Sequence, residues 1–253
     1  MRTLHALCFT LTLAIASAQG ARAEDIKVLT AGAMKSVVLE MVPGFEKATG
    51  HKVSVKNDTA GGLAKRIEGG EAFDLAVITP AVIDALIKSG KVQAGTRINL
   101  AKVGMGVAVK TGAPVPDIAS VDAFKRALTS ARAVTYIDPK AGGSSGIYFD
   151  RLLERLGIAD PVRAKAKLKA GGYVAEALVT GEADLAVHQI SEILPVKGVT
   201  LVGPLPAEVQ NYTIYSGGLA SAATAAAGAR ALLQLLAGPE TLPVLKSKGM
   251  ERG

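Results

Sequence analysis

The feature of this sequence that most constrains its fold is the regular alternation of short apolar stretches with longer stretches of helical period. In the first part of the chain, three strand-like segments are each followed by an amphipathic segment that ends at glycine. These pairs occupy residues 26–29 and 37–50, 51–57 and 61–70, and 73–79 and 80–90. A βαβαβα order predicts a parallel sheet covered on both faces by helices, with ligands at the carboxyl ends of its strands. We expect Pro43 to kink or divide the first helix.

The second half of the chain repeats the alternation. Strands are predicted at residues 103–110, 133–138, 184–190, 198–203 and 211–220, and helices at 120–128, from 144 onward, and at 173–181, 221–236 and 239–248. We therefore expect an α/β protein of two lobes, each a mostly parallel sheet flanked by helices. The predicted division is residues 24–105 plus 212–253 for one lobe and 106–211 for the other, with a hinge near 103–110 and 210–217. A ligand cleft is expected between the lobes, because small-molecule sites favour such boundaries.

The first 23 residues have the layout of a secretory signal peptide. Arg2 precedes an apolar run from Leu4 to Ile15, and a small-residue ending at Ala23 predicts cleavage before Glu24. Residues 16–18 offer a second cleavage point. No later stretch has the roughly 18 uninterrupted apolar residues of a membrane span, so we expect an exported protein that lacks direct membrane insertion and resides in the periplasm.

Composition excludes several classes of function. The single cysteine, Cys8, lies inside the predicted signal, so no disulfide or thiolate chemistry is expected in the mature chain. No paired histidines or His-Glu-x-x-His pattern exist to build a metal site, and no complete nucleotide motif is present, so no cofactor is expected. The absence of Trp and the few other aromatic residues argue against nucleic-acid binding. The net charge of +7, which falls by two when Arg2 and Arg22 are removed, suits a small anionic ligand.

Small residues gather where extended segments meet helices. The stretch from 142 to 146, Gly-Gly-Ser-Ser-Gly, precedes an amphipathic helix, and residues 31–34, 58–62 and 170–173 repeat the arrangement. The first turn of a helix has amides without internal partners and the positive end of the macrodipole, so an anion can bind there. An ordinary serine N-cap after a glycine turn is the alternative for any one of them. Their repetition predicts a cleft lined with amides.

Two titratable side chains are candidates for chemistry near these helix starts. His188 ends a predicted strand, where it either contacts ligand or is a hydrogen-bonded core histidine. Tyr148, one turn into the helix after Ser144, points either to the cleft or to the sheet. His51 begins a strand and is expected at the surface. The candidate ligand-binding residues are Ala33, Met34, Thr59, Ala60, Gly61, Ser144, Ser145, Gly146, Gly171, Gly172, His188 and Gln189.

Several longer stretches resemble one known family. They are VLTAGAM with FEKATG, TAGGLAKRIEGGEAFDLAVIT, SSGIYFDRLLERLGI, ALVTGEADLAV and LLQLLAGPETLPVLKSKGM, which together span nearly the whole mature chain. In order and spacing they resemble the periplasmic molybdate-binding proteins of ABC transporters, within the type II solute-binding superfamily. The resemblance implies a monomeric, hinged, two-lobed binding protein that closes on a small anion and presents it to a membrane permease.

The sequence also departs from that family. Its members use a serine hydroxyl in each of the first two loops and a tyrosine in the second lobe. The matching positions here are Ala33, Ala60 and His188, with Ser145 and about Gly171 as the other matches. Each lost charge-assisted hydrogen bond is worth about 1.5–3 kcal/mol, so tight molybdate binding is not expected.

A carboxylate is the alternative ligand, with donors from Thr59, Ser144, Ser145 and Gln189. The stretch HQISEILPVKGVTLVGPLP is similar to a divergent branch that also resembles periplasmic aconitate isomerases. Binding of a small anion is our main prediction, because this architecture does not itself imply catalysis. The alternative is a cofactor-free isomerase in which His188 and Tyr148 act as acid and base and the amides of Ser144 and Ser145 stabilise negative charge.

Overall fold

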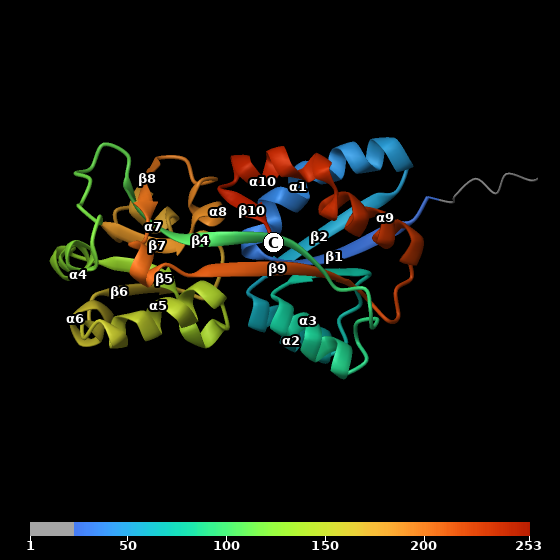
Figure 1. Cartoon of the computed structure of the whole chain (residues 1–253), viewed down its shortest axis with the longest axis horizontal. Helices are drawn as coiled ribbons and strands as arrows, with labels where there is room; N and C mark the ends of the chain where they lie inside the picture. The colour runs from blue at the N-terminus through green and yellow to red at the C-terminus, as the bar shows by residue number, and fades with distance from the viewer. Residues whose placement is uncertain (1–22) are drawn as a thin grey trace, which may run out of the picture.

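The computed structural model describes residues 23–253, and the predicted signal peptide lies outside this range except for Ala23. The described elements alternate between strands and helices along the chain, as expected from the sequence (Figure 1). They are β1 (Asp25–Ala31), α1 (Gly32–Thr49), β2 (Lys52–Asp58), α2 (Ala60–Glu68), β3 (Leu75–Ile78), α3 (Pro80–Lys88), β4 (Ile98–Lys110), α4 (Val121–Ser130), β5 (Val134–Ile137), η1 (Pro139–Ala141), α5 (Ser144–Arg155), α6 (Ala159–Arg163), β6 (Ala166–Lys169), α7 (Glu176–Val179), β7 (Leu185–Gln189), α8 (Ile190–Ile193), β8 (Val199–Pro204), η2 (Ala207–Val209), β9 (Tyr212–Leu219), α9 (Ala226–Ala237), η3 (Pro239–Thr241), α10 (Leu242–Ser247) and β10 (Met250–Arg252). None of the helices in this range is long and apolar enough to cross a membrane.

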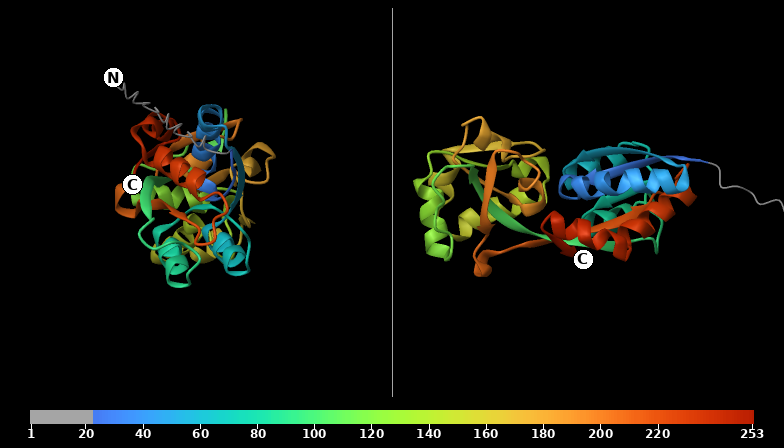
Figure 2. Two further views of the ribbon diagram at one scale, coloured as in Figure 1. Left: turned by 90° about the vertical axis from the view of Figure 1, so that its right-hand side faces the viewer. Right: turned by 90° about the horizontal axis from the view of Figure 1, so that it is seen from above.

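The strands follow the order β2-β1-β3-β9-β4-β7-β5-β6, and β8 and β10 also pair with β4. The outer strands of each half are parallel: β1 pairs with β2 and β3, and β5 pairs with β6 and β7. Strand β4 joins the halves, because Ile98–Gly104 pair with β9 while Met105–Ala108 pair with β7. Seen from above, two α/β bodies are joined by a narrow waist through which β4 passes (Figure 2).

Four separate clusters of buried apolar side chains cover the faces of these sheets. In the first body, one cluster joins the sheet to α1, α9 and α10, and another joins it to α2 and α3. In the second body, one cluster lies under α4, α5 and α6, and the other under α7 and α8. The fully buried residues of each cluster come largely from one body, but the partly buried Ile190, in α8 of the second body, packs against the cluster under α1. Most of the hydrophobic stabilisation is therefore formed within each body, and strand β4 joins the two.

Some of the expected elements differ from those observed. Helix α1 is not divided at Pro43, because this proline lies on the exposed side, where water can bond to the Leu39 carbonyl that loses its amide partner. The helix expected at 173–181 is reduced to the single turn of α7, between glycines at 172 and 181 that have φ angles of 75° and 78°. Strands β6 and β10 were not predicted from the sequence.

Two further differences have causes in tertiary contacts. His51 is buried, not at the surface: its Nδ1 accepts a hydrogen bond from the Glu24 amide (3.0 Å) and its ring stacks on Phe45. Helix α9 begins at Ala226 instead of residue 221. The amides of Thr224 and Ala225 donate to the buried Asp74 carboxylate at 2.7 and 3.0 Å, which holds this segment outside the helix.

Candidate functional site

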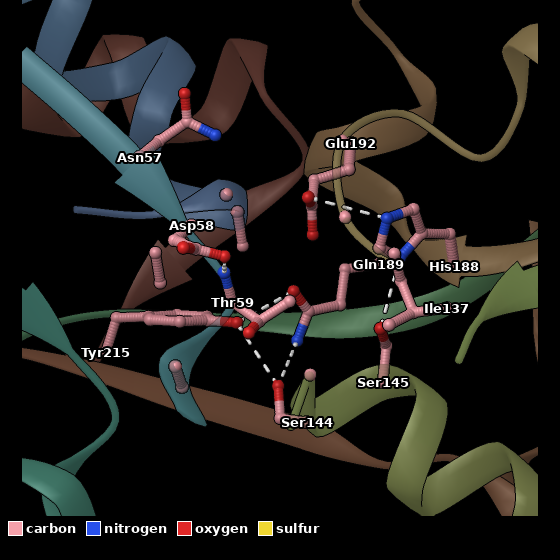
Figure 3. A pocket seen from close by; sticks show the side chains of 17 residues that line it. Asn57, Asp58, Thr59, Ile137, Ser144, Ser145, His188, Gln189, Glu192 and Tyr215 are labelled. Carbon is pink, nitrogen blue, oxygen red and sulfur yellow. Dashed lines mark hydrogen bonds and ion pairs between the residues drawn. The ribbon is translucent and has the colours of Figure 1, made fainter. Parts of the chain in front are cut away.

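A pocket lies between the two bodies at the carboxyl ends of β1, β2, β5 and β7, where an α/β fold places its ligands. It encloses about 380 Å³, including open solvent at its mouth. Backbone and side chains from both bodies form its wall (Figure 3). The lining residues are Ala31, Gly32, Ala33, Asn57, Asp58, Thr59, Ala60, Ile137, Gly143, Ser144, Ser145, Gly171, Gly172, His188, Gln189, Glu192 and Tyr215.

Two helices begin at this pocket without a side-chain cap. Helix α1 starts after Ala31 and helix α5 after Gly143, and neither N-cap residue can accept a hydrogen bond through its side chain. Their first amides have no partner within the helix, so they are available to an anion. Helix α2 differs, because the hydroxyl of Thr59 accepts from the Gly62 amide at 3.0 Å and caps that helix internally.

A connected set of polar side chains forms one side of the pocket. The Tyr215 hydroxyl donates to Gln189 Oε1 at 2.8 Å, and Gln189 Nε2 donates to Ser144 Oγ at 3.3 Å. Ser144 Oγ and the Tyr215 hydroxyl lie 3.4 Å apart (Figure 3). Burial raises the pKa of Tyr215 above its usual range, and the negative charge of Glu192 raises it further. Tyr215 therefore stays a neutral hydrogen-bond donor that fixes the orientation of the Gln189 amide.

A second set lies on the other side and contains the titratable groups. Ser145 Oγ lies 3.2 Å from His188 Nδ1, and His188 Nε2 lies 3.4 Å from Glu192 Oε1 (Figure 3). The exposed fractions of His188 and Glu192 are only 1% and 6%. When the proton is on Nε2, this N–H faces the Glu192 carboxylate, and Nδ1 accepts a hydrogen bond from the Ser145 hydroxyl. The imidazole and the carboxylate thus lie side by side in the pocket wall.

Two loops from opposite bodies touch beside the pocket. The Thr59 hydroxyl donates to the Ala141 carbonyl at 2.5 Å, and the Gly61 amide donates to the Gly142 carbonyl at 3.1 Å. A Cβ on Gly61 would lie 2.9 Å from Gly142 Cα, closer than real Cβ contacts. The two facing glycines therefore allow a close backbone approach that closes this side of the pocket.

Most of the residues proposed from the sequence lie in the pocket wall, and four do not. Met34 is fully buried in the cluster under α1, and Gly146 packs against the Ile137 backbone, where it leaves no room for a side chain. Gly61 directs its amide to Gly142, outside the lining. The Tyr148 hydroxyl donates to the Val209 carbonyl at 2.7 Å and is likewise outside the lining, so Tyr148 is not an acid or base at this pocket.

Sequence reasoning missed four polar lining residues: Asn57, Asp58, Glu192 and Tyr215. Asp58 is compensated, since its Oδ1 accepts from the Thr59 amide and its Oδ2 pairs with Arg66 at 3.3 Å. Glu192 lies four residues after His188, but His188 lies in strand β7 and Glu192 lies in helix α8, so the spacing alone did not indicate that the two side chains meet. Tyr215 gave no local signal, because it lies within a strand far from the other site residues in sequence.

The pocket has no evident metal site and little positive charge. Within residues 23–253 no group of three or more His, Cys, Asp or Glu side chains is placed to hold a metal ion. Among the described residues that line the pocket none is Lys or Arg. Helix amides and hydroxyls are thus the groups that can attract an anion.

Comparisons with known proteins agree with this architecture. Residues 26–251 match the family described as bacterial extracellular solute-binding protein. The chain is 33% identical over 232 residues to an aconitate isomerase of a Pseudomonas species, covering 89% of this chain and 87% of that protein. It is 28% identical over 247 residues to the molybdate-binding protein ModA of Azotobacter vinelandii, covering 90% of each. The solved periplasmic molybdate-binding protein of that organism superposes with a TM-score of 0.77 at 19% identity, over 90% of this chain and 99% of the other.

With a pocket between two α/β bodies, the chain has the two-lobed α/β fold of periplasmic binding proteins. The chain belongs to the bacterial extracellular solute-binding protein family. The likeness to the solved molybdate-binding protein, at its low identity, bears on the fold alone.

Proposed function

We propose that this protein captures a small organic anion, a carboxylate, in the pocket between its lobes. The observation that carries the proposal is the start of helix α5, where an uncapped N-terminus presents the amides and hydroxyls of Ser144 and Ser145 to the pocket. A carboxylate bound there would accept hydrogen bonds from these amides and from the Ser144 hydroxyl, and would interact favourably with the helix macrodipole.

The lack of hydroxyls at two other positions supports a carboxylate over molybdate. Ala33 and Ala60 line the pocket without offering a side-chain donor, and Thr59 uses its hydroxyl on Ala141. A tetrahedral dianion would be left with few donors on this side, at a cost of about 1–3 kcal/mol for each missing hydrogen bond.

We further propose how the protein works as a carrier. The lobes are residues 24–105 plus 212–253 and residues 106–211, and closure about 103–110 and 210–217 brings Gly61 against Gly142. The monomer is exported by its N-terminal signal, binds its ligand in the periplasm and presents it to an ABC permease. Each lobe has its own pair of apolar clusters, which supports movement of the lobes as rigid bodies.

A thermal-shift screen tests the binding proposal. Oxyanions and di- and tricarboxylates are added singly, with neutral sugars as the control. A ligand at 100 times its dissociation constant adds about 2.7 kcal/mol to the free energy of unfolding, so its melting temperature rises by several degrees. We expect a carboxylate to give the largest rise. A larger rise with molybdate, or no rise with any anion, would contradict the proposal.

A second candidate function is isomerisation of an unsaturated tricarboxylate. Two observations favour it: the 33% identity to an aconitate isomerase, and the buried His188 beside Glu192 in the pocket wall. Conversion of trans- to cis-aconitate removes a proton from the methylene carbon beside the double bond and returns a proton to the CH carbon of that double bond. The double bond shifts and the composition is unchanged, so no cofactor is consumed. His188 would move this proton while the α5 amides stabilise the developing charge.

The two functions are separated by an assay for turnover. Purified protein is incubated with trans-aconitate and the cis isomer is followed by chromatography. If the protein is an isomerase, His188→Gln should lower the rate by roughly 10²–10⁴-fold, whereas Tyr148→Phe, the control outside the pocket, should not. If it is a binding protein, no conversion occurs and His188→Gln alters affinity only modestly. No conversion at high protein concentration rules out the second candidate.

A further inference from the structure

Glu192 is a buried carboxylate that faces the pocket without a hydrogen-bond partner. It is 94% buried, yet neither of its oxygens accepts a hydrogen bond from any residue between 23 and 253. His188 Nε2, 3.4 Å from Oε1, is itself buried without a hydrogen-bond partner. Glu192 lines the pocket, so a bound group with a hydrogen to donate can occupy the lone pairs of its carboxylate.

The groups that face Glu192 are the His188 imidazole and the start of helix α1. None of the described Lys and Arg side chains lies within ion-pair distance of it, and His188 is the one charged or titratable partner recorded there. The other titratable side chains in the pocket wall are Asp58, which is paired with Arg66, and Tyr215, which is neutral. Glu192 is therefore a carboxylate of the pocket wall that has no Lys or Arg partner among the described residues and that an incoming anion meets.

The position of this carboxylate is accommodated by the start of helix α1. A Cβ on Gly32 would collide with Glu192 Oε1, so the glycine leaves room for the carboxylate above the first turn. The positive end of the α1 macrodipole thus faces a carboxylate of the protein itself. The equivalent end of helix α5, on the opposite side of the pocket, faces no such group and is left for the ligand.

We infer that Glu192 is a specificity-determining residue. It favours anions that can donate a hydrogen bond to its carboxylate and disfavours anions that have no hydrogen to donate. An ionised carboxylate can only accept hydrogen bonds. A ligand hydroxyl or protonated carboxyl satisfies it, whereas a fully deprotonated oxyanion such as sulfate or molybdate meets repulsion with no hydrogen bond. The ligand class is a small organic acid with a carboxylate at the α5 end and a hydrogen-bearing group at the Glu192 end. This inference rests on the proposed anion site.

The test compares tetrahedral anions that have a hydrogen to donate with tetrahedral anions that have none. Calorimetric titrations with sulfate, molybdate and phosphate are run at neutral pH, where phosphate carries a hydrogen and the other two do not. We expect the natural protein to bind phosphate more tightly than sulfate. Glu192→Gln, which replaces an acceptor by an amide that can donate, should raise the affinity for sulfate or molybdate by roughly tenfold or more.

Matched variants make the outcomes distinct. Glu176→Gln makes the same change of charge on an exposed carboxylate paired with Lys169, outside the pocket, and should leave all three affinities unchanged. Glu192→Ala removes the charge without adding a donor, so it should also improve sulfate or molybdate binding, and it serves if the glutamine variant does not fold.

Two results would separate a failure of the Glu192 inference from a failure of the proposed anion site. If neither Glu192 variant binds sulfate or molybdate better than the natural protein, the inference is wrong, whatever the natural ligand is. If the gain appears but persists after Ser145→Pro is added, the dianion binds elsewhere, and the proposed anion site is what fails.

Discussion

The contact between Gly61 and Gly142 offers a direct test of whether closure of the two lobes controls binding. Gly61→Ala adds a methyl group that would lie 2.9 Å from Gly142 Cα and 3.2 Å from its carbonyl oxygen. Both atoms belong to backbone, and Gly142 is held in a left-handed turn with a φ angle of 76°. The strain cannot be relieved by rotating a side chain, so the two loops must separate.

The size of the effect follows from the hydrogen bonds that separation would break. These are the bonds from the Thr59 hydroxyl to Ala141 and from the Gly61 amide to Gly142. At about 0.5–1.5 kcal/mol each, the closed form loses about 1–3 kcal/mol relative to the open form. If the ligand is held by the closed form, the apparent affinity should fall by about 5- to 150-fold.

Overall stability should move in the opposite direction. Gly61 lies in the first turn of α2 with an ordinary negative φ angle, and alanine is favoured over glycine in helices by up to about 1 kcal/mol. The melting temperature of the ligand-free variant should therefore stay the same or rise. Weaker binding together with undiminished stability would distinguish a defect of closure from a folding defect.

The assay combines calorimetry with small-angle X-ray scattering. The probe is the carboxylate that gives the largest thermal shift, and scattering shows whether the variant remains more extended when that ligand is present. Gly44→Ala is the control, because this glycine lies in helix α1 with nothing within 4 Å of a built Cβ. An affinity within twofold of the natural protein, with an unchanged scattering curve, would refute the role of this contact.

Three further predictions address export, the anion site and the core. N-terminal sequencing of periplasmic material should read from Glu24, and retention of Met1 would contradict the signal assignment. Ser145→Pro removes an amide donor from the start of α5, so affinity should fall by roughly tenfold or more with an unchanged circular dichroism spectrum; unchanged affinity would place the ligand elsewhere. Asp74→Ala should lower the free energy of unfolding by about 3–5 kcal/mol in urea titrations, because the buried carboxylate accepts from the amides of Lys27, Thr224 and Ala225. A loss below 1 kcal/mol would show that these bonds are replaced.

The alternation of strands and helices could be predicted from the sequence because it depends on interactions between residues that are close along the chain. The apolar period of each segment and the glycine that ends each helix are properties of a few consecutive residues, and the observed order β1-α1-β2-α2-β3-α3 follows them. The helix start at Ser144 was predicted for the same reason, and the helix predicted from residue 61 begins one residue earlier, at Ala60. We could also expect these helix starts to lie close together, because the carboxyl ends of parallel strands lie along one edge of a sheet.

What the sequence could not reveal depends on contacts between distant residues. Helix α9 starts late because Asp74, some 150 positions earlier, takes two of its amides. Tyr148 and His188 carried similar local signals, yet the fold turns Tyr148 toward Val209 and His188 toward Ser145 and Glu192. Which way a side chain on an amphipathic element points is decided by the partner that it meets.

The sequence by itself thus determined the class of fold and the places where backbone amides are exposed at helix starts. Only the tertiary structure decided that Glu192 and Tyr215 belong to the pocket and that Gly61 serves contact between loops instead of lining the pocket. The physical reason is that periodicity and capping act over a few residues, whereas burial, charge compensation and close backbone approach exist only once separate segments are brought together.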